Sequence, residues 1–264
     1  MTVSGTGSIA LNPATANGAA TAVTGGTLNM GLSAAGTVNA ATGNAFTGQI
    51  NVSGTGAVSI NGTAYGVIST NAGLPGMTPT GDYVLSGNLN AGAMAFTPIA
   101  TFTGVLDGLG HTVSNLTINL PTISNVGLFA TTGSSAAIRN LGIASGSVAG
   151  NAYVGGLVGY NLGTISNSYA AEAVTGIHYV GGLVGQNHGT TATISNSYTT
   201  GTVSGNLGSD DVGGLAGNNN GTLSNDYATG NVTGATNGLD TGGLVGYNYG
   251  PPTRRQRPPQ IRFP

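Results

Sequence analysis

The chain has 264 residues, 49 glycines, no cysteine, a formal net charge of −2 and only 5% charged residues, where about 25% is usual in soluble domains. Residues 1–250 contain no lysine and a single arginine, Arg139, which excludes the basic face that a nucleic-acid-binding protein needs. The sequence has no run of 18 apolar residues, so no membrane-spanning helix is expected, and the lack of cysteine excludes disulfides.

Residues 1–72 alternate short β-prone runs with Gly and Asn, as in GQINVSGTGAVSINGTAYGVI, and predict irregular coils of a β-solenoid. No basic segment followed by an apolar core is visible at their start, so no secretory signal is identified. Residues 73–125 predict further coils, because GDYVLSGNLNAG and FTGVLDGLGHTVSNLTI each read as short strands around Gly-rich turns. The segment NAGLPGMTPTG at 71–81 has the composition of a linker.

Residues 126–250 contain an internal repeat with three markers. A leucine after glycine recurs with spacings of 29, 26, 32 and 29 residues, at Leu128, Leu157, Leu183, Leu215 and Leu244. An asparagine recurs at Asn140, Asn167, Asn196 and Asn225, and a valine recurs at Val148, Val174, Val203 and Val232. The fixed order of short apolar elements predicts an all-β, right-handed parallel β-helix with about three short strands per coil of roughly 25–32 residues.

The leucines are expected in the core of this β-helix. In VGGLVG, Val154 and Leu157 differ in parity, so the glycine pair between them predicts a bend or bulge that turns both side chains inward. In ISNSY, Asn167 shares parity with Ile165 and Tyr169, which places the four repeat asparagines inside as a hydrogen-bonded structural ladder. The alternative is that each asparagine takes a left-handed conformation at a corner.

Residues 251–264, PPTRRQRPPQIRFP, break the pattern with five prolines and four arginines and predict a disordered tail. The last GGLVG copy stops at Gly250 without an Asn-centred strand. An uncovered last coil exposes apolar surface and strand edges, so we expect end-to-end self-association through residues near 242–250.

The GGLVG copies resemble the GLUG motif, in which U is a hydrophobic residue. The segment GDYVLSGNLNAGAMAFTPIATFTGVLDGLGHTVSNLTI and the segment INGTAYGVIST resemble the stretches that precede such repeats in filamentous haemagglutinin-like adhesins, so the resemblance covers about 60 to 250. The chain departs from that family in showing no signal peptide and no NPNG-like signature, because Asn12 and Pro13 are followed by Ala14. It therefore looks like an internal piece of a larger adhesin.

This resemblance implies a secreted or cell-surface exoprotein of the two-partner secretion type, exported through an outer-membrane transporter. The chain is then a non-enzymatic adhesive segment, a β-helical shaft whose variable loops contact glycans or proteins of host or neighbouring cells. One alternative is a repeat spacer of a larger secreted enzyme such as a peptidase. Another is an ice-binding β-helix, which needs a flat face of stacked threonines; TTAT at 190–193 is not repeated in the other copies.

Motifs of enzymes and cofactor sites are absent, including HExxH, GxSxG, the P-loop and the GGxGxD calcium nonapeptide, so no catalytic, cofactor-binding or metal-ligating residue is assigned. Asp107 and His111 in DGLGH are two potential ligands on a Gly turn, which is too few for a metal site. His178 and His188 have no equivalents in the other copies and are expected in exposed loops without a role.

Three tyrosines are the candidate ligand contacts. Tyr160, Tyr247 and Tyr249 follow the G-L motif in two copies, where the other copies carry Gln186 and Asn218. Exposed tyrosines suit contact with a carbohydrate or a protein. The alternative is that each aromatic ring shields a turn.

Overall fold

The structure is a computed structural model that describes residues 2–5, 8–11, 27–32, 37–40, 49–54, 57–60, 63–92, 94–235 and 237–249. Over these ranges the chain forms β-strands and one 3-10 turn, η1 (Asn71–Gly73), without an α-helix. It follows that none of the described segments is a helix able to cross a bilayer. The expected disordered tail at 251–264 and Gly250 lie outside the described residues.

The chain winds as a parallel β-helix whose coils cross four sheets, named I to IV here in the order in which the chain meets them. Sheet I stacks six strands: β10 (Ile99–Phe102), β14 (Phe129–Thr132), β19 (Val158–Asn161), β23 (Val184–Asn187), β27 (Ala216–Asn219) and β32 (Val245–Asn248). Sheet II follows with β8 (Tyr83–Leu85), β11 (Val105–Asp107), β15 (Ala137–Arg139), β20 (Thr164–Ser166), β24 (Thr193–Ser195) and β28 (Thr222–Ser224).

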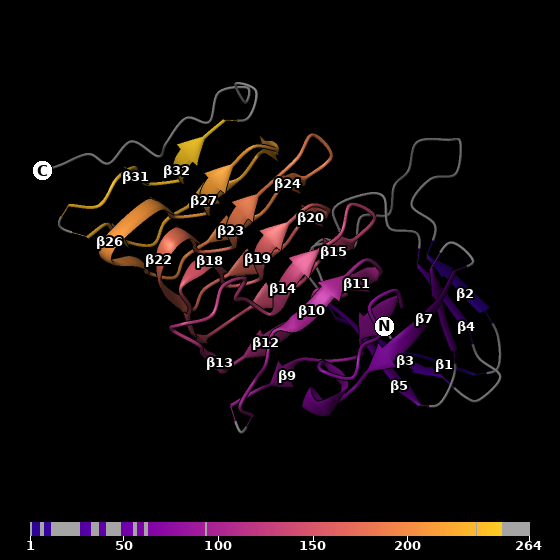
Figure 1. Ribbon diagram of the computed structural model, residues 1–264. Helices are drawn as coiled ribbons and strands as arrows, with labels where there is room; N and C mark the ends of the chain where they lie inside the picture. Colours follow the sequence, from indigo (N-terminus) through magenta and orange to yellow (C-terminus); the bar gives the residue numbers. More distant parts are fainter. Residues whose placement is uncertain are drawn as a thin grey trace, which may run out of the picture.

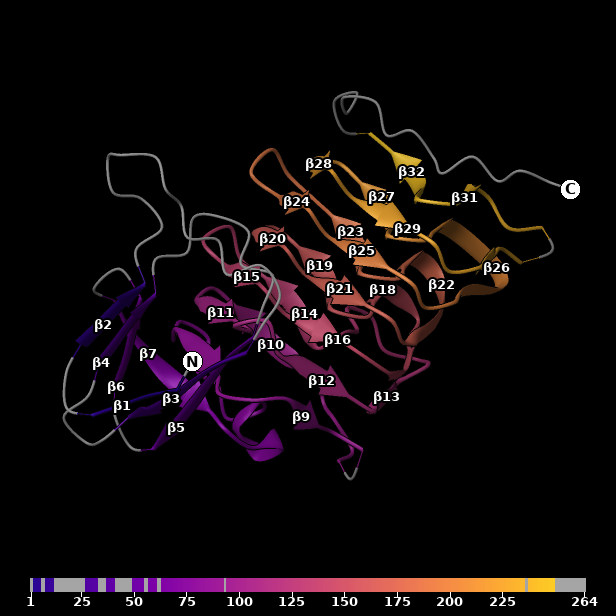
Figure 2. The ribbon, with the colours of Figure 1, turned by 180° about the vertical axis from the view of Figure 1, so that it is seen from behind.

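Sheets III and IV close each coil. Sheet III contains β9 (Leu89–Asn90), β12 (Thr112–Ser114), β16 (Gly142–Ile143), β21 (Tyr169–Ala170), β25 (Tyr198–Thr199) and β29 (Tyr227–Ala228). Sheet IV contains β13 (Leu116–Asn119), β17 (Gly146–Ala149), β18 (Ala152–Gly155), β22 (Ala173–Gly181), β26 (Val203–Gly213), β30 (Val232–Thr233) and β31 (Thr241–Gly242). Figure 1 shows the sheet I strands side by side from β10 to β32, and Figure 2 shows sheet III from behind.

The predicted parallel β-helix is therefore confirmed, but each coil crosses four sheets, where about three strands per coil were expected. The sheet III strands of the repeats are only two residues long. Each begins two residues after a repeat asparagine, so the ISNSY segment divides at this asparagine into two strands that lie on different sheets. The right-handed sense of winding stays a prediction from the rule for parallel crossovers.

The amino-terminal strands lie at one end of the stack and β30 to β32 lie at the other (Figures 1 and 2). Two parallel ladders alternate along the chain: β1 (Thr2–Gly5), β3 (Thr27–Leu32) and β5 (Gln49–Gly54) form one, and β2 (Ser8–Leu11), β4 (Thr37–Ala40) and β6 (Ala57–Ile60) form the other. β6 pairs antiparallel with β7 (Thr63–Ile68), which continues into sheet II through β8. This two-ladder arrangement differs from the four-sheet coils that follow it.

The segment at 71–81 is not a linker. Leu74 is fully buried and Met77 is nearly so, and both belong to the same apolar core as Ile68 and Leu85. The linker prediction was wrong because it weighed the Gly and Pro content and not the two large apolar side chains. The segment packs into the core near the amino-terminal end of the β-helix.

The repeat leucines form a column inside the coils. Leu128, Leu157, Leu183 and Leu215 are all 0% exposed, as predicted, and Leu244 is only partly buried because it lies on the last described coil. The predicted bend at the glycine pair is also confirmed, since Val154, Leu157 and Val158 are all buried. A Cβ atom at Gly155 would overlap the carbonyl oxygen of Val158, so only glycine fits at this corner.

The extra residues of β26 are accommodated on sheet IV by a shift in register between Gly176 and His178. Between β22 and β26, Gly176 pairs with Gly205 and His178 pairs with Asp210, so the segment 206–209 lies opposite Ile177 alone. Leu207 in this insertion is 82% exposed, which confirms the outward loop expected at LGSDD. On the next sheet the register is restored, and Val184 pairs with Ala216.

Replacement of Leu183 by Ala should cost about 2–5 kcal/mol of unfolding free energy, because the cavity lies between two packed coils that cannot collapse onto it. Leu183 lies between Leu157 and Leu215, to which it is joined by backbone hydrogen bonds of 3.0 and 2.9 Å. The matched control is Leu244→Ala, which removes the same atoms from a partly exposed position. Urea unfolding of the two variants checks the prediction, and equal losses would contradict the assignment of the core.

Candidate functional site

The four repeat asparagines lie at an outer corner between sheets II and III. Asn140, Asn167, Asn196 and Asn225 have φ angles of 53°, 49°, 49° and 58°. The inward prediction was wrong: Asn167, Asn196 and Asn225 are exposed and Asn140 is half-buried. The parity argument failed because the backbone turns at the asparagine itself, and the corner alternative is the one observed. Asparagine suits this conformation since it tolerates positive φ better than most residues.

A different set of asparagines forms the buried ladder. The Nδ2 atoms of Asn161, Asn187 and Asn219 donate to the Oδ1 atoms of Asn187, Asn219 and Asn248 at 2.7, 2.8 and 2.7 Å. Asn161, Asn187 and Asn219 are fully buried, and Thr132 extends the ladder by donating to Asn161 at 2.6 Å. The sequence signal was available, because each of these asparagines follows the repeat leucine by four residues.

A second internal column lies just after the corner and consists of Ser168, Ser197 and Asp226. Each side chain accepts a backbone N–H of the preceding coil: Leu141 donates to Ser168 at 3.3 Å, Ser168 to Ser197 at 3.2 Å, and Ser197 to Asp226 at 2.8 Å. Burial raises the pKa of Asp226 to about 6. This column ties backbone to side chain between coils, so its polar groups are structural.

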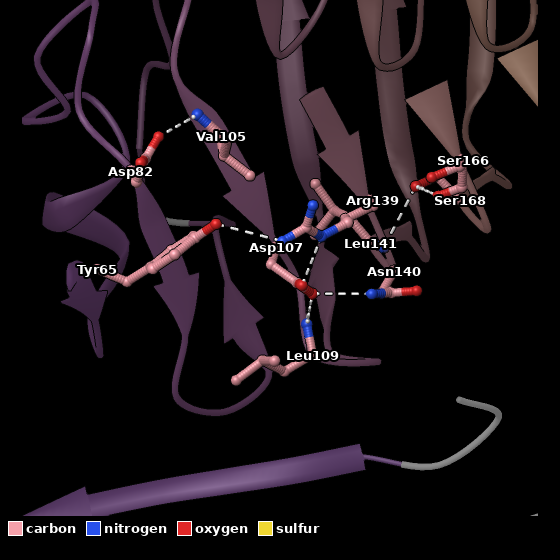
Figure 3. A network of polar contacts seen from close by, with 10 residues as sticks. All are labelled: Tyr65, Asp82, Val105, Asp107, Leu109, Arg139, Asn140, Leu141, Ser166 and Ser168. Carbon is pink, nitrogen blue, oxygen red and sulfur yellow. Dashed lines mark hydrogen bonds and ion pairs between the residues drawn. The ribbon is translucent and has the colours of Figure 1, made fainter. Parts of the chain in front are cut away.

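The one arginine of the chain body is part of a closed polar network (Figure 3). Nε of Arg139 lies 2.7 Å from Oδ2 of Asp107, whose Oδ1 accepts from Asn140 Nδ2 at 2.9 Å and Leu109 N at 3.0 Å. Nη2 of Arg139 donates to the hydroxyl of Tyr65 at 3.2 Å, which links β15 to β7. Asp107 is fully buried and both its oxygens are occupied, so the network fastens coils together and leaves no carboxylate oxygen for a ligand.

Asp107 and His111 do not form a metal pair. The ring nitrogens of His111 lie 3.2 Å from Asn88 Oδ1 and 2.8 Å from the carbonyl of Ile50, and burial lowers its pKa. Within the described ranges, no three His, Asp or Glu side chains gather as metal ligands.

The other two histidines make contacts that the sequence did not indicate. His178 lies 2.9 Å from Asp210 on the next coil, and both side chains are about 40% exposed, at 41% and 39%. His188 is half-buried and its ring packs against Tyr160 with a centroid distance of 5.5 Å. The expectation of an exposed loop fails for His178, which lies on strand β22, and His188 is only partly exposed.

An aromatic cluster occupies the corner between sheets IV and I. The rings of Tyr153 and Tyr179 stack with centroids 4.8 Å apart, and Tyr160 meets Tyr153 edge-on at 5.6 Å. Together with His188, these make a continuous surface of four rings, named the four-ring cluster below. Of the three predicted contact tyrosines, only Tyr160 belongs to it.

Tyr247 and Tyr249 form a separate pair on the last described coil, with ring centroids 4.4 Å apart. Tyr160 and Tyr247 occupy equivalent positions of sheet I, and Gln186 and Asn218 lie between them on the intervening strands. Tyr160 lies on strand β19, and its ring contacts Tyr153 at the corner.

A third group of aromatic residues was missed by the sequence analysis. Tyr169, Tyr198 and Tyr227 stack on sheet III with centroid distances of 5.0 and 4.9 Å and nearly parallel rings. Each ring stacks on the next, with the 47% exposed Tyr227 at the end of the column, and we interpret this tyrosine ladder as a contribution to coil stacking. The tyrosine that ends each ISNSY-type copy is the sequence feature that could have predicted this ladder.

Glu172, like Asp226, is a buried acidic side chain without a charged partner. Glu172 is 2% exposed, and its Oε2 accepts the Ala171 N–H at 3.0 Å. Its Oε1 has no hydrogen-bond partner among the described residues and fills the space beside Gly156. Burial raises the pKa of Glu172 to about 8. At neutral pH this carboxyl group is therefore predominantly protonated.

Replacement of Asn187 by Ala should lower the unfolding free energy by about 1–3 kcal/mol, because it leaves the buried amides of Asn161 and Asn219 short of partners. The matched variant is Asn196→Gly at the exposed corner, which keeps the left-handed conformation and should change stability little. Thermal and urea unfolding measure both. A larger loss from Asn196→Gly would show that the exposed asparagines carry the ladder.

The raised pKa of Glu172 predicts a loss of stability as pH increases. The ordinary pKa of the Glu172 carboxyl group is 4.5, and its pKa in the folded state is about 8. Between these two pH values the folded state keeps a proton that the unfolded chain releases. Stability is therefore fully present below pH 4.5 and falls toward pH 8, by roughly 1.4 kcal/mol per pH unit at most. Unfolding measured between about pH 7 and pH 8, above the folded pKa of Asp226, should show this slope for the natural chain and not for Glu172→Gln. Parallel slopes would contradict the prediction.

Comparisons with known proteins agree with this architecture. The GLUG motif matches residues 150–175 and 176–204. Halomucin of Haloquadratum walsbyi is 40% identical over 103 residues, which covers 34% of this chain and 1% of halomucin.

A crystal structure titled "putative immunoglobulin A1 protease" from Bacteroides ovatus shares the fold with a TM-score of 0.58 and 18% identity, over 71% of this chain and 63% of that one. The chain thus spans less than two thirds of either relative. The coils at 150–204 of this β-helix are GLUG repeats.

Proposed function

We propose that the chain is a non-enzymatic structural and adhesive segment of a secreted surface protein. The observation that carries this proposal is the use of the repeat: the side chains that recur from coil to coil contact their own equivalents on the next coil, as in the ladder from Asn161 to Asn248. The variable residues on the outside include Leu207 in the insertion at 206–209, which is 82% exposed. A shaft that holds variable surfaces away from a cell is expected to have such a constant scaffold and such variable surface residues.

The similarity to halomucin and the GLUG matches support a surface location for the longer protein. The finer proposals rest on the sequence resemblance to filamentous haemagglutinin-like adhesins. These are export by two-partner secretion through an outer-membrane transporter, and attachment to glycans or proteins of host or neighbouring cells. End-to-end association is a separate proposal, which rests on the strand edges expected to be uncovered near residues 242–250.

A repeat spacer of a larger secreted enzyme such as a peptidase is the second candidate. The fold shared with the Bacteroides ovatus structure favours it, although 18% identity carries only the fold. In this candidate the coils serve as a spacer and the chemistry lies in another part of the longer protein.

Ice binding is the third candidate, and the structure corrects one point about it. Thr193 has equivalents in Thr164 and Thr222, which pair with it in register on sheet II, so threonines do stack outside the TTAT segment. The hydroxyls of Thr164 and Thr193 donate to backbone carbonyls at 3.3 and 3.4 Å, and the column is three coils long. We rank this candidate last because so short a column offers little area.

Attachment of protein-coated beads to cells tests the proposed function. Beads that carry the full chain should bind microbial or epithelial cell layers saturably, and soluble chain should compete with them. Beads that carry Leu183→Asp, which buries an unpaired carboxylate and unfolds the coils, are the control and should not bind. If the folded chain gives no more attachment than this control, the adhesive proposal is wrong, and cleavage of surface proteins by the chain would show enzymatic activity.

A further inference from the structure

We propose that the four-ring cluster of Tyr153, Tyr160, Tyr179 and His188, together with Gln186, binds an uncharged oligosaccharide. This inference rests on the proposed adhesive function and names the chemistry of its ligand.

The backbone position of two of the tyrosines is unfavourable for their residue type. One corner between sheets IV and I carries Asn125, Tyr153, Tyr179, Asp211 and Asp240 on successive coils, all with positive φ, between 34° and 60°. Asn and Asp adopt this conformation readily, whereas a bulky side chain there is an outlier. Two adjacent coils nevertheless carry tyrosine. Strain held in this way is characteristic of functional positions, because the fold alone would be better served by asparagine.

The strained rings are joined into one surface. Tyr153 stacks on Tyr179 with an interplanar angle of 8°, and its contact with Tyr160 is close to perpendicular, at 86°. All three tyrosines and His188 are half-buried, so each ring has an inner part packed on the coil and an outer part in solvent. Such a surface offers apolar ring area for the C–H groups of a sugar and phenolic hydroxyls for its hydroxyl groups.

Gln186 supplies an amide beside these rings. It pairs in register with Tyr160 on one side and with Asn218 on the other, in the middle of sheet I. Its Nε2 donates to Asn218 Oδ1 at 3.3 Å, while Asn218 Nδ2 donates to Asp211 Oδ2 at 2.7 Å. This chain of contacts orients the Gln186 amide and uses one of its two N–H groups, which leaves the other and the carbonyl oxygen to meet sugar hydroxyls.

The charge around the cluster selects an uncharged ligand. Arg139 is the only Lys or Arg side chain in the described part of the chain, and it lies on sheet II, bound to Asp107. The acids near the cluster are already engaged, since Asp210 contacts His178 and Asp211 accepts from Asn218. An acidic polysaccharide, a phosphate group or nucleic acid would therefore meet no free cation on this face.

Binding of defined oligosaccharides tests the proposal. The probes are linear hexasaccharides of glucose, mannose and galactose, with hexagalacturonate as the anionic control. Binding to the full chain is followed by saturation-transfer NMR and by tyrosine fluorescence, which is readable because the chain has no tryptophan. The test variant is Tyr153→Asn combined with Tyr179→Asn, which installs the residue that the same corner carries at Asn125. We expect at least one neutral hexasaccharide to bind, with affinity at least tenfold lower for the double variant and no binding of hexagalacturonate.

Two further variants make the outcome unambiguous. Tyr160→Gln installs the residue of the next coil and should also weaken binding, whereas Tyr227→Ala, at the end of the tyrosine ladder on sheet III, should not. The double variant should melt at the same or a higher temperature than the natural chain, so a loss of binding is not a loss of folding. Failure of every neutral hexasaccharide to bind, or equal binding by the double variant, overturns the proposal.

The bead assay separates this inference from the proposed function. If beads attach but no oligosaccharide binds, or if attachment survives periodate oxidation of the cell-surface sugars, the partner is a protein and the oligosaccharide proposal is wrong. If oligosaccharides bind but beads do not attach, the surface is a sugar site and the adhesive function fails.

Discussion

The structure depends on the pairing of each coil with the next one along the axis. Parallel strands one coil apart lie about 4.8 Å from each other, so every inward side chain meets the equivalent side chain of its neighbour at nearly the same distance. Apolar columns such as Leu157, Leu183 and Leu215 satisfy this constraint by contact alone. A primary amide suits a buried polar column because it has a donor and an acceptor, so each rung can donate to one neighbour and accept from the other. The ladder from Asn161 to Asn248 uses this arrangement in the interior.

The same constraint explains the scarcity of charge. A charged side chain that recurred in one column would lie next to a like charge on each side, with an unfavourable energy that grows in the low-dielectric interior. The acids inside the fold are instead single substitutions within otherwise neutral columns, such as Asp226 after Ser168 and Ser197. Asp107 is charged and buried because Arg139 is its neighbour on the next coil, which makes the pair the one place in the described chain where opposite charges stack.

The sequence predicted the repeat, the parallel β-helix and the leucine column because these depend on spacing, which is visible in one dimension. The inward position of Asn167 was wrong because strand parity holds only while the backbone stays extended, and this residue turns the corner with a φ of 49°. The strand number was underestimated since a two-residue strand such as β21 has no period to detect. The four-ring cluster could not be predicted from the sequence, because Tyr153 and Tyr160 belong to different sheets and meet only after the corner is folded.

The buried asparagine ladder has a consequence for how such a gene can change. Each rung bonds equally well to the rung above and the rung below, so the removal of the whole coil that contains Asn187 would bring Asn161 against Asn219 and restore the same amide contact. Recombination between repeats can therefore shorten or lengthen the protein by whole coils without a mismatched junction. The number of coils can thus vary freely in this architecture. By contrast, a surface built from two neighbouring coils, such as the one that contains the tyrosines at 153 and 179, is lost or duplicated in a single recombination event.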